Sequence, residues 1–222
     1  MRQLMFLGPG RVEWQETAEP AVGGPLEAIV APVAVATCDL DVAILRGTFR
    51  AFPGKFPLGH EGVARVTEVG EGVTSVSPGD LVVVPFQISC GTCPACRADR
   101  TGNCASVPLG SMYGYEPFGG PWGGFLADRV RVPYADAMLV RLKPPADPAA
   151  VASLSDNVCA GGPLPRPGPG VRRAGRRARR PGQRGPDPAR GRLVPGHRGR
   201  HIGMMCLILT KSGVGRTVRP TA

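Results

Sequence analysis

Four cysteines lie close together in the middle of this 222-residue chain, in the pattern Cys90-x-x-Cys93-x-x-Cys96-x7-Cys104. Four thiolates within 15 residues of sequence can form a tetrahedron around one zinc ion. Because all four ligands would be protein sulfur, no coordination position would remain for water or a substrate. The pattern therefore predicts a structural zinc site in a cysteine-rich lobe at 89–105, where metal binding would supply folding free energy.

The alternatives for these cysteines are a disulfide pair, free thiols and an iron–sulfur cluster. Cysteine quartets also hold iron–sulfur clusters, but nothing else in the sequence indicates electron transfer. The apolar run after Met1 is too short for a signal peptide, and Gly8-Pro9 breaks it. No stretch approaches the roughly 20 apolar residues that span a bilayer. We therefore expect a cytoplasmic protein without a membrane segment, whose clustered cysteines stay reduced and bind metal.

Cys38 and His60 are further candidates for metal binding. His60 is the only imidazole before residue 159, because the other two histidines are His197 and His201. Each residue also has an ordinary explanation, since a buried cysteine is usually a small hydrophobe and a single histidine usually packs or lies at the surface. Composition and spacing alone leave both interpretations open.

The segments around these residues have the character of short strands joined by turns. The 32 glycines and 25 prolines exclude a long helical bundle. Alternating or continuous apolar runs predict strands. The expected strands are 1–15 with a turn at 8–10, 26–36, 63–69, 81–86, 125–132 and 138–142, with a loop at 110–124 and a short helix from Asp147 towards Leu154. We therefore expect a mainly β domain.

Several ordered motifs resemble the zinc-containing medium-chain alcohol dehydrogenases. These motifs are Cys38-x-x-Asp41, Gly59-His60-Glu61-Gly62, Val69-Gly70-Glu71-Gly72-Val73, Pro78-Gly79-Asp80 and the cysteine quartet. Val132-Pro133-Tyr134-Ala135-Asp136 and Leu154-Ser155-Asp156-Asn157 are similar to the branch that contains formaldehyde dehydrogenases. The resemblance runs from Met1 to about Asn157. It implies a GroES-like, partly open β-barrel over 1–158 with a zinc-bound cysteine lobe and a short helix.

The resemblance also implies a catalytic zinc site. In that family one cysteine, the histidine of the Gly-His-Glu motif and a third residue hold the ion, and these roles fall here on Cys38, His60 and Asp156. Three such ligands leave the fourth position open. Glu61 is implied as an outer group or transient ligand, although by itself it fits a solvated carboxylate at a strand end equally well. One departure is Leu40, which stands where the family often has a Ser or Thr that passes a proton.

The implied reaction is hydride transfer between a small alcohol or aldehyde and NAD(P), with zinc as the Lewis acid. The family binds its cofactor on a βαβ unit with a Gly-x-Gly-x-x-Gly turn. Gly168-x-Gly170 does not fit this fingerprint, because no strand pattern precedes it and no apolar helix follows it. We therefore expect two zinc ions, no cofactor domain within these residues and little or no turnover by the chain alone. The substrate and the oligomeric state are left open.

The chain changes character near residue 160. Residues 1–159 carry a net charge of −4, whereas 160–222 carry +14. The 41 residues from 160 to 200 contain 12 Arg, 10 Gly, 8 Pro and 4 Ala, which leaves too little apolar surface to offset the entropy of ordering. We therefore expect 159–222 to be a disordered basic tail. A GC-rich gene read in a shifted frame yields the same composition, so a frameshift near 158–165 is a further hypothesis.

The alternative function is a zinc-binding protein whose basic tail binds nucleic acid. Clustered arginines can neutralise phosphates with strongly salt-dependent affinity. The tail has no interleaved aromatic residues for base stacking, and no nucleic-acid-binding module is recognisable. We expect only non-specific nucleic-acid binding through this tail.

Overall fold

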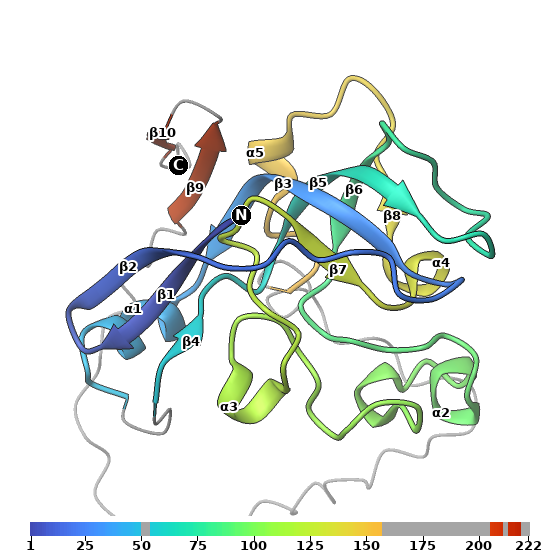
Figure 1. The fold of residues 1–222 in the computed structure, drawn as a ribbon, viewed down its shortest axis with the longest axis horizontal. Coiled ribbons are helices and arrows are strands. Elements are labelled where there is room, and N and C mark those ends of the chain that lie inside the picture. The colour runs from blue at the N-terminus through green and yellow to red at the C-terminus, as the bar shows by residue number, and fades with distance from the viewer. Residues whose placement is uncertain (50–53, 157–204, 211–212, 219–222) are drawn as a thin grey trace, which may run out of the picture. The chain divides into compact units, whose positions relative to one another are not determined.

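The computed structural model describes residues 1–49, 54–156, 205–210 and 213–218, the last two through their backbone alone. The elements, all of which except η1 are labelled in Figure 1, are β1 (Arg2–Gly8), β2 (Arg11–Glu16), β3 (Ala28–Thr37), α1 (Asp39–Leu45), β4 (Phe56–Pro57), β5 (Glu61–Val69), β6 (Leu81–Val84), α2 (Pro94–Arg97), η1 (Thr101–Asn103), α3 (Glu116–Gly119), β7 (Val130–Val132), α4 (Ala135–Met138), β8 (Val140–Arg141), α5 (Pro148–Val151), β9 (Met205–Thr210) and β10 (Gly213–Val218). The chain divides into one unit of 1–161 with 203–222 and another of 162–202, which lies outside the described residues. The first unit is therefore the one described below.

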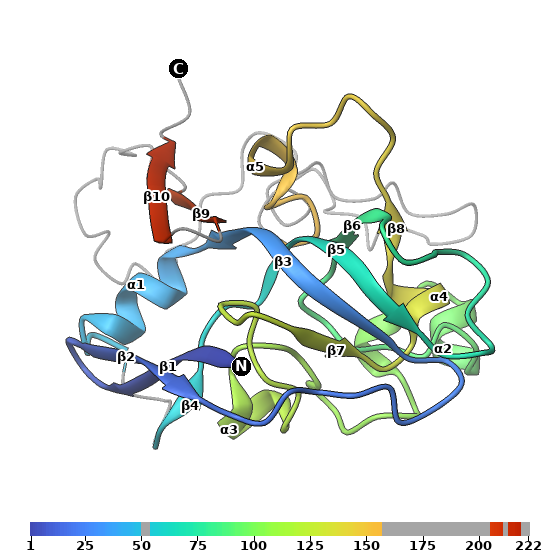
Figure 2. The same ribbon diagram turned by 45° about the horizontal axis from the view of Figure 1, so that its top comes forward.

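Two antiparallel sheets form this unit. The larger has the strand order β10-β9-β3-β5-β6-β8 with β7 also paired to β3, and the smaller has the order β2-β1-β4. Figure 1 and Figure 2 both show β3 and β5 running side by side. Their register pairs Ala36 with Glu61 and Val35 with Gly62. Because the two strands are antiparallel, the end of β3 lies beside the start of β5, next to Cys38 and His60 respectively.

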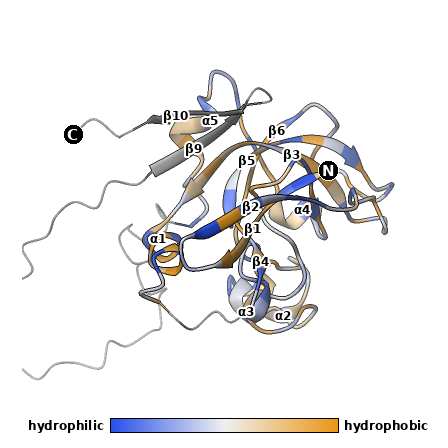
Figure 3. Cartoon of the chain, turned by 60° about the vertical axis from the view of Figure 1, so that its left-hand side comes forward, coloured by the Kyte–Doolittle hydropathy of each residue, from blue (hydrophilic) through white to orange (hydrophobic). Residues whose placement is uncertain are grey.

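The apolar faces of β3 and β5 form the centre of the core. Figure 3 shows mostly hydrophobic colouring along β3, whose Ile29, Val30 and Val35 are fully buried. The two strands pack very closely at Gly62, where an added Cβ would collide with the Ala34 carbonyl oxygen. The expected mainly β fold with short helices is confirmed. Among the described residues, no helix has the length and apolar character needed to cross a membrane.

One helix differs from the sequence-based expectation. The sequence predicts no helix after Cys38, but α1 begins at Asp39 and runs for seven residues. The Asp41 Oδ2 atom accepts a hydrogen bond from the Cys38 N–H at 2.7 Å, which satisfies a donor at the N-terminus of the helix. The sequence does not predict this helix because its seven residues are too few to show a clear helical periodicity.

Two short strands lie within the segment that the sequence predicts to be a disordered basic tail. β9 and β10 form an antiparallel hairpin, and β9 pairs with β3 at Val35, Ala36 and Thr37. The physical reason lies in the apolar run from Met204 to Leu209, which can add to the edge of a sheet. The arginine-rich stretch and the suspected frameshift position lie outside the described residues.

Candidate metal centres

The four cysteines of the quartet come together in the lobe that contains α2 and η1. Their Sγ atoms all lie within 4.8 Å of one another, and none of the five cysteines whose side chains the structure describes forms a disulfide. Backbone N–H groups point at the sulfurs: Cys93 donates to Cys90 Sγ at 3.4 Å and Cys96 donates to Cys93 Sγ at 3.5 Å. Such donors stabilise thiolates, as a metal site requires.

The pKa values of the cysteine thiols indicate that four thiolates in this lobe would need a cation. The hydrogen bond from Ser106 Oγ is the main cause that lowers the pKa of Cys90 to about 5, against the effect of burial. Burial raises the pKa of Cys96 to about 12. A compact set of four thiolates is therefore unfavourable without a cation among them, and Zn²⁺ is the ordinary ion for four cysteine ligands.

The second centre lies between the end of β3 and the start of β5. In Figure 1 and Figure 2, α1, which follows Cys38, lies far from α2, which carries Cys96. Gly59, which precedes His60, has a φ of +92°, and a Cβ there would lie 2.6 Å from the Leu126 backbone nitrogen. The glycine therefore lets the chain turn tightly against Leu126 and directs the His60 ring into the interior.

The two ring nitrogens of His60 have different surroundings. The residue is 1% exposed. Its Nδ1 atom lies 3.5 Å from Asp41 Oδ2, and its Nε2 atom lies 3.4 Å from Asp156 Oδ2. The Nε2 atom is buried and makes no hydrogen bond with the described residues. A buried imidazole nitrogen without a hydrogen bond is unfavourable unless a ligand such as a metal ion occupies that position.

The candidate ligands form two overlapping groups that share His60. Cys38, Asp41 and His60 form one group, and His60, Glu61 and Asp156 form the other; within each, the ligand atoms lie within 4.8 Å of one another. Of the three ligands expected from the sequence, Cys38 and Asp156 each lie close to His60. However, Cys38 and Asp156 belong to different groups. Glu61 is fully buried, so the alternative of a solvated strand-end carboxylate is wrong.

The charge balance of this centre also fits a cation. Burial alone lowers the pKa of His60, but the neighbouring side chains of Asp156, Asp41 and Cys38 outweigh it and raise the pKa to about 12. Three carboxylates and a thiol therefore surround one imidazole in a largely buried position. A divalent ion between them would offset this negative charge.

Two residues near His60 were missed as contributors to the centre. Asp41 entered the sequence analysis only as part of a motif, and Tyr115 lies in a segment expected to be a loop. The Tyr115 hydroxyl donates to Asp41 Oδ1 at 2.7 Å and lies 3.4 Å from His60 Nδ1 and 3.9 Å from Cys38 Sγ. Burial raises the pKa of Tyr115 far above its usual range, so the hydroxyl keeps its proton. No sequence signal indicates contacts between residues this distant along the chain.

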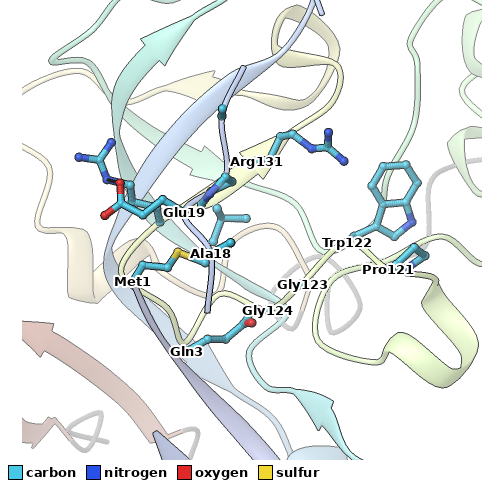
Figure 4. A pocket seen from close by; sticks show the side chains of 13 residues that line it. Met1, Gln3, Ala18, Glu19, Pro121, Trp122, Gly123, Gly124 and Arg131 are labelled. Atoms are coloured by element: carbon cyan, nitrogen blue, oxygen red, sulfur yellow. Dashed lines mark ion pairs between the residues drawn. The ribbon is translucent and has the colours of Figure 1, made fainter. Parts of the chain in front are cut away.

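A separate cavity of about 320 Å³ lies elsewhere in the unit. It is lined by Glu19, Trp122, Arg131 and neighbouring residues, several of which Figure 4 shows with their side chains. None of the described candidate metal ligands lines this cavity. It is therefore a feature separate from both candidate centres.

The β-domain, its cysteine lobe and its Cys–His–carboxylate cluster correspond to a known class of domain, the catalytic domains of zinc-type dehydrogenases. A family model described as the alcohol dehydrogenase GroES-like domain matches residues 24–144, which is more than half of the chain. The chain therefore belongs to this family of oxidoreductases. The matched residues include Cys38, His60 and the quartet.

Relatives and solved structures agree with this membership. Glutathione-independent formaldehyde dehydrogenase from Pseudomonas aeruginosa is 38% identical over 173 residues, which cover 74% of this chain and 42% of the relative. Zinc-type alcohol dehydrogenase B from Aspergillus flavus is 33% identical over 141 residues, covering 64% and 31%. The structure of alcohol dehydrogenase TADH from Thermus sp. ATN1 superposes with a TM-score of 0.63 at 36% identity, covering 70% and 44%. The chain thus spans less than half the length of these proteins, and the resemblance and GroES-like fold expected from its motifs are confirmed.

Proposed function

We propose that this chain supplies the zinc-binding, substrate-side part of an alcohol or aldehyde dehydrogenase. In this proposal Cys38, His60 and Asp156 hold a catalytic zinc ion, and the quartet of Cys90, Cys93, Cys96 and Cys104 holds a structural one. The observation that carries the proposal is the buried His60 Nε2 atom, which lacks a hydrogen bond and faces Asp156. Three protein ligands would leave the fourth position for the substrate oxygen.

Zinc bound at such a site supplies Lewis acidity, which lowers the pKa of an alcohol or polarises a carbonyl group. The residues of the chain prepare the site for it. Asp41 lies on the Nδ1 side of His60, so it would keep a proton at Nδ1 while zinc takes the place of the proton at Nε2. The acidic partner thereby selects the ring tautomer that can act as a ligand.

Ser155 has a positioning role in this proposal. Its hydroxyl lies 3.1 Å from Glu61 Oε2 and 3.0 Å from the Val84 carbonyl oxygen. These contacts attach the segment that ends at Asp156 to β5 and β6. Glu61 acts through Ser155 in holding Asp156 near His60, and it is itself a member of the second ligand group.

The hydride acceptor would be NAD(P), as the family resemblance implies. The residues that the structure describes include no glycine-rich turn between a parallel strand and a helix, which is what a dinucleotide site needs. We therefore expect the chain alone to bind zinc and to turn over little or no alcohol. The nucleic-acid alternative depends on arginines outside the described residues, and we do not propose it.

Metal analysis of the purified chain tests this proposal directly. We expect two zinc ions per chain, and one in a Cys38→Ser, His60→Ala double variant that still folds. A wild-type chain with one zinc ion would contradict the catalytic centre. A chain with no bound metal would contradict both centres.

A further inference from the structure

Tyr115 lies where three groups of the second centre meet. Its hydroxyl is 2.7 Å from Asp41 Oδ1, 3.4 Å from His60 Nδ1 and 3.9 Å from Cys38 Sγ. Its ring lies beside the imidazole, with 5.4 Å between centroids and an interplanar angle of 31°. Tyr115 is 4% exposed, so these contacts occur in the interior.

The backbone holds the tyrosine and the histidine next to each other. Gly114 precedes Tyr115 and Gly59 precedes His60, and a Cβ on Gly114 would lie 2.5 Å from the Gly59 carbonyl oxygen. That same oxygen accepts a hydrogen bond from the Phe125 N–H at 2.8 Å. The approach requires a glycine at position 114, so the placement of Tyr115 beside His60 is built into the backbone.

The Asp41 carboxylate divides its two oxygens between different partners. Oδ1 accepts from Tyr115, whereas Oδ2 accepts from the Cys38 N–H and faces His60 Nδ1. Loss of the tyrosine hydroxyl would leave Oδ1 without this donor, and the carboxylate could then rotate. Rotation would weaken both the cap at Cys38 and the orientation of the His60 ring.

We propose that Tyr115 is a positioning residue for the metal centre: its hydroxyl holds the Asp41 carboxylate so that Asp41 orients both His60 and Cys38 towards one cation. This inference rests on the proposed function, because it needs a metal at the second centre. The hydroxyl is the part that matters, since a phenylalanine would fill the same space in the core.

Cobalt binding to the full chain, with the quartet loaded with zinc, tests this role. We expect Tyr115→Phe to lower the Co²⁺ affinity of the second centre by about 10-fold, the lower end of the range for outer hydrogen-bond partners of metal ligands. The visible absorption bands of the bound Co²⁺ should shift as well, because the ligand geometry changes. A residue with a merely structural role would leave this spectrum unchanged.

Tyr113→Phe is the matched control. Tyr113 is fully buried in the same loop, and its hydroxyl donates to the Arg131 carbonyl oxygen at 3.0 Å, away from the metal ligands. This variant should lose stability without any change in Co²⁺ affinity or spectrum. Equal losses of affinity in both variants, or wild-type binding by Tyr115→Phe, would overturn the inference.

A double-mutant cycle shows whether Tyr115 acts through Asp41. In an Asp41→Asn background, Tyr115→Phe should have less than a 2-fold further effect on Co²⁺ affinity; additive losses would overturn the route through Asp41. A wild-type chain that binds metal only at the quartet would overturn the proposed function itself. A wild-type chain that binds two ions while Tyr115→Phe behaves identically would overturn this inference alone.

Discussion

The Oδ2 atom of Asp156 lies 3.4 Å from the Nε2 atom of His60, on the side of the imidazole that makes no hydrogen bond. Asp156 follows α5, whereas His60 directly precedes β5. Ser155 connects the two segments through its contacts with Glu61 and Val84. The position of Asp156 therefore depends on the contacts that the neighbouring Ser155 side chain makes with the central sheet.

Asp156→Asn should impair the second centre selectively. An amide is a poorer ligand than a carboxylate, and the change removes a negative charge next to His60. We expect a loss of more than about 10-fold in Co²⁺ affinity at that centre, larger than for an outer hydrogen-bond partner, with the quartet still loaded. Titration with Co²⁺ measures the effect. Asp147→Asn is the control: Asp147 caps α5 by accepting from the Ala149 N–H, and because Asn caps a helix about as well as Asp, this variant should leave Co²⁺ affinity unchanged.

Gly62→Ala should destabilise the sheet that carries His60. The new Cβ would collide with the Ala34 carbonyl oxygen, which is backbone and cannot move aside cheaply. We expect a cost of about 1–3 kcal/mol, typical of overpacking, and a lowering of Tm by about 2–4 °C for each kcal/mol. Thermal unfolding followed by circular dichroism measures it. Gly24→Ala meets nothing closer than 3.8 Å, and an equal loss there would refute the steric explanation.

Removal of metal from the quartet should unfold the cysteine lobe before the sheet. Among the described residues, the apolar side chains other than cysteine that pack against the buried cysteines of the lobe are Val107 and Tyr134, so we expect its stability to come largely from the ion. A strong chelator should release zinc and increase amide hydrogen exchange at 89–105 first. Exchange in β3 and β5 should stay slow in the same sample. Unchanged exchange of the lobe after complete zinc removal would show that it folds without metal.

The Asp136 carboxylate should make the stability depend on pH. It accepts hydrogen bonds from the N–H and hydroxyl groups of Thr74 and Ser75. Burial raises its pKa, but these bonds outweigh burial and lower the pKa from 3.8 to about 2. Because the folded-state pKa is depressed, this stabilisation is present above about pH 4 and is lost as the pH falls towards 2.

Asp136→Asn tests that prediction. The variant should have a lower Tm than wild type at pH 7, and the difference should shrink steadily between pH 4 and pH 2. Thermal unfolding of both proteins at each pH gives the difference in Tm. Acid effects that are common to the two proteins cancel in this difference. Asp128→Asn is a suitable comparison, since Asp128 pairs with Arg2 at the surface and should have a smaller effect at neutral pH. A constant difference at all pH values would contradict the role of the Asp136 charge.

The sequence by itself determined the features that depend on short-range pattern. The quartet spans only residues 90–104, so its spacing already constrains which atoms can meet. The apolar runs at 26–36, 63–69 and 81–86 predict β3, β5 and β6, because alternation and burial have direct sequence signatures. The motif order was sufficient to indicate the family.

The tertiary structure decided the features that depend on register and on packing between distant segments. The antiparallel pairing of Ala36 with Glu61 brings the end of β3 to the start of β5, and with it Cys38 to His60. The close approach of Gly114 to Gly59 brings Tyr115 to the centre. The sequence could not specify which His60 nitrogen lacks a hydrogen bond, because that depends on side-chain orientations set by the surrounding packing.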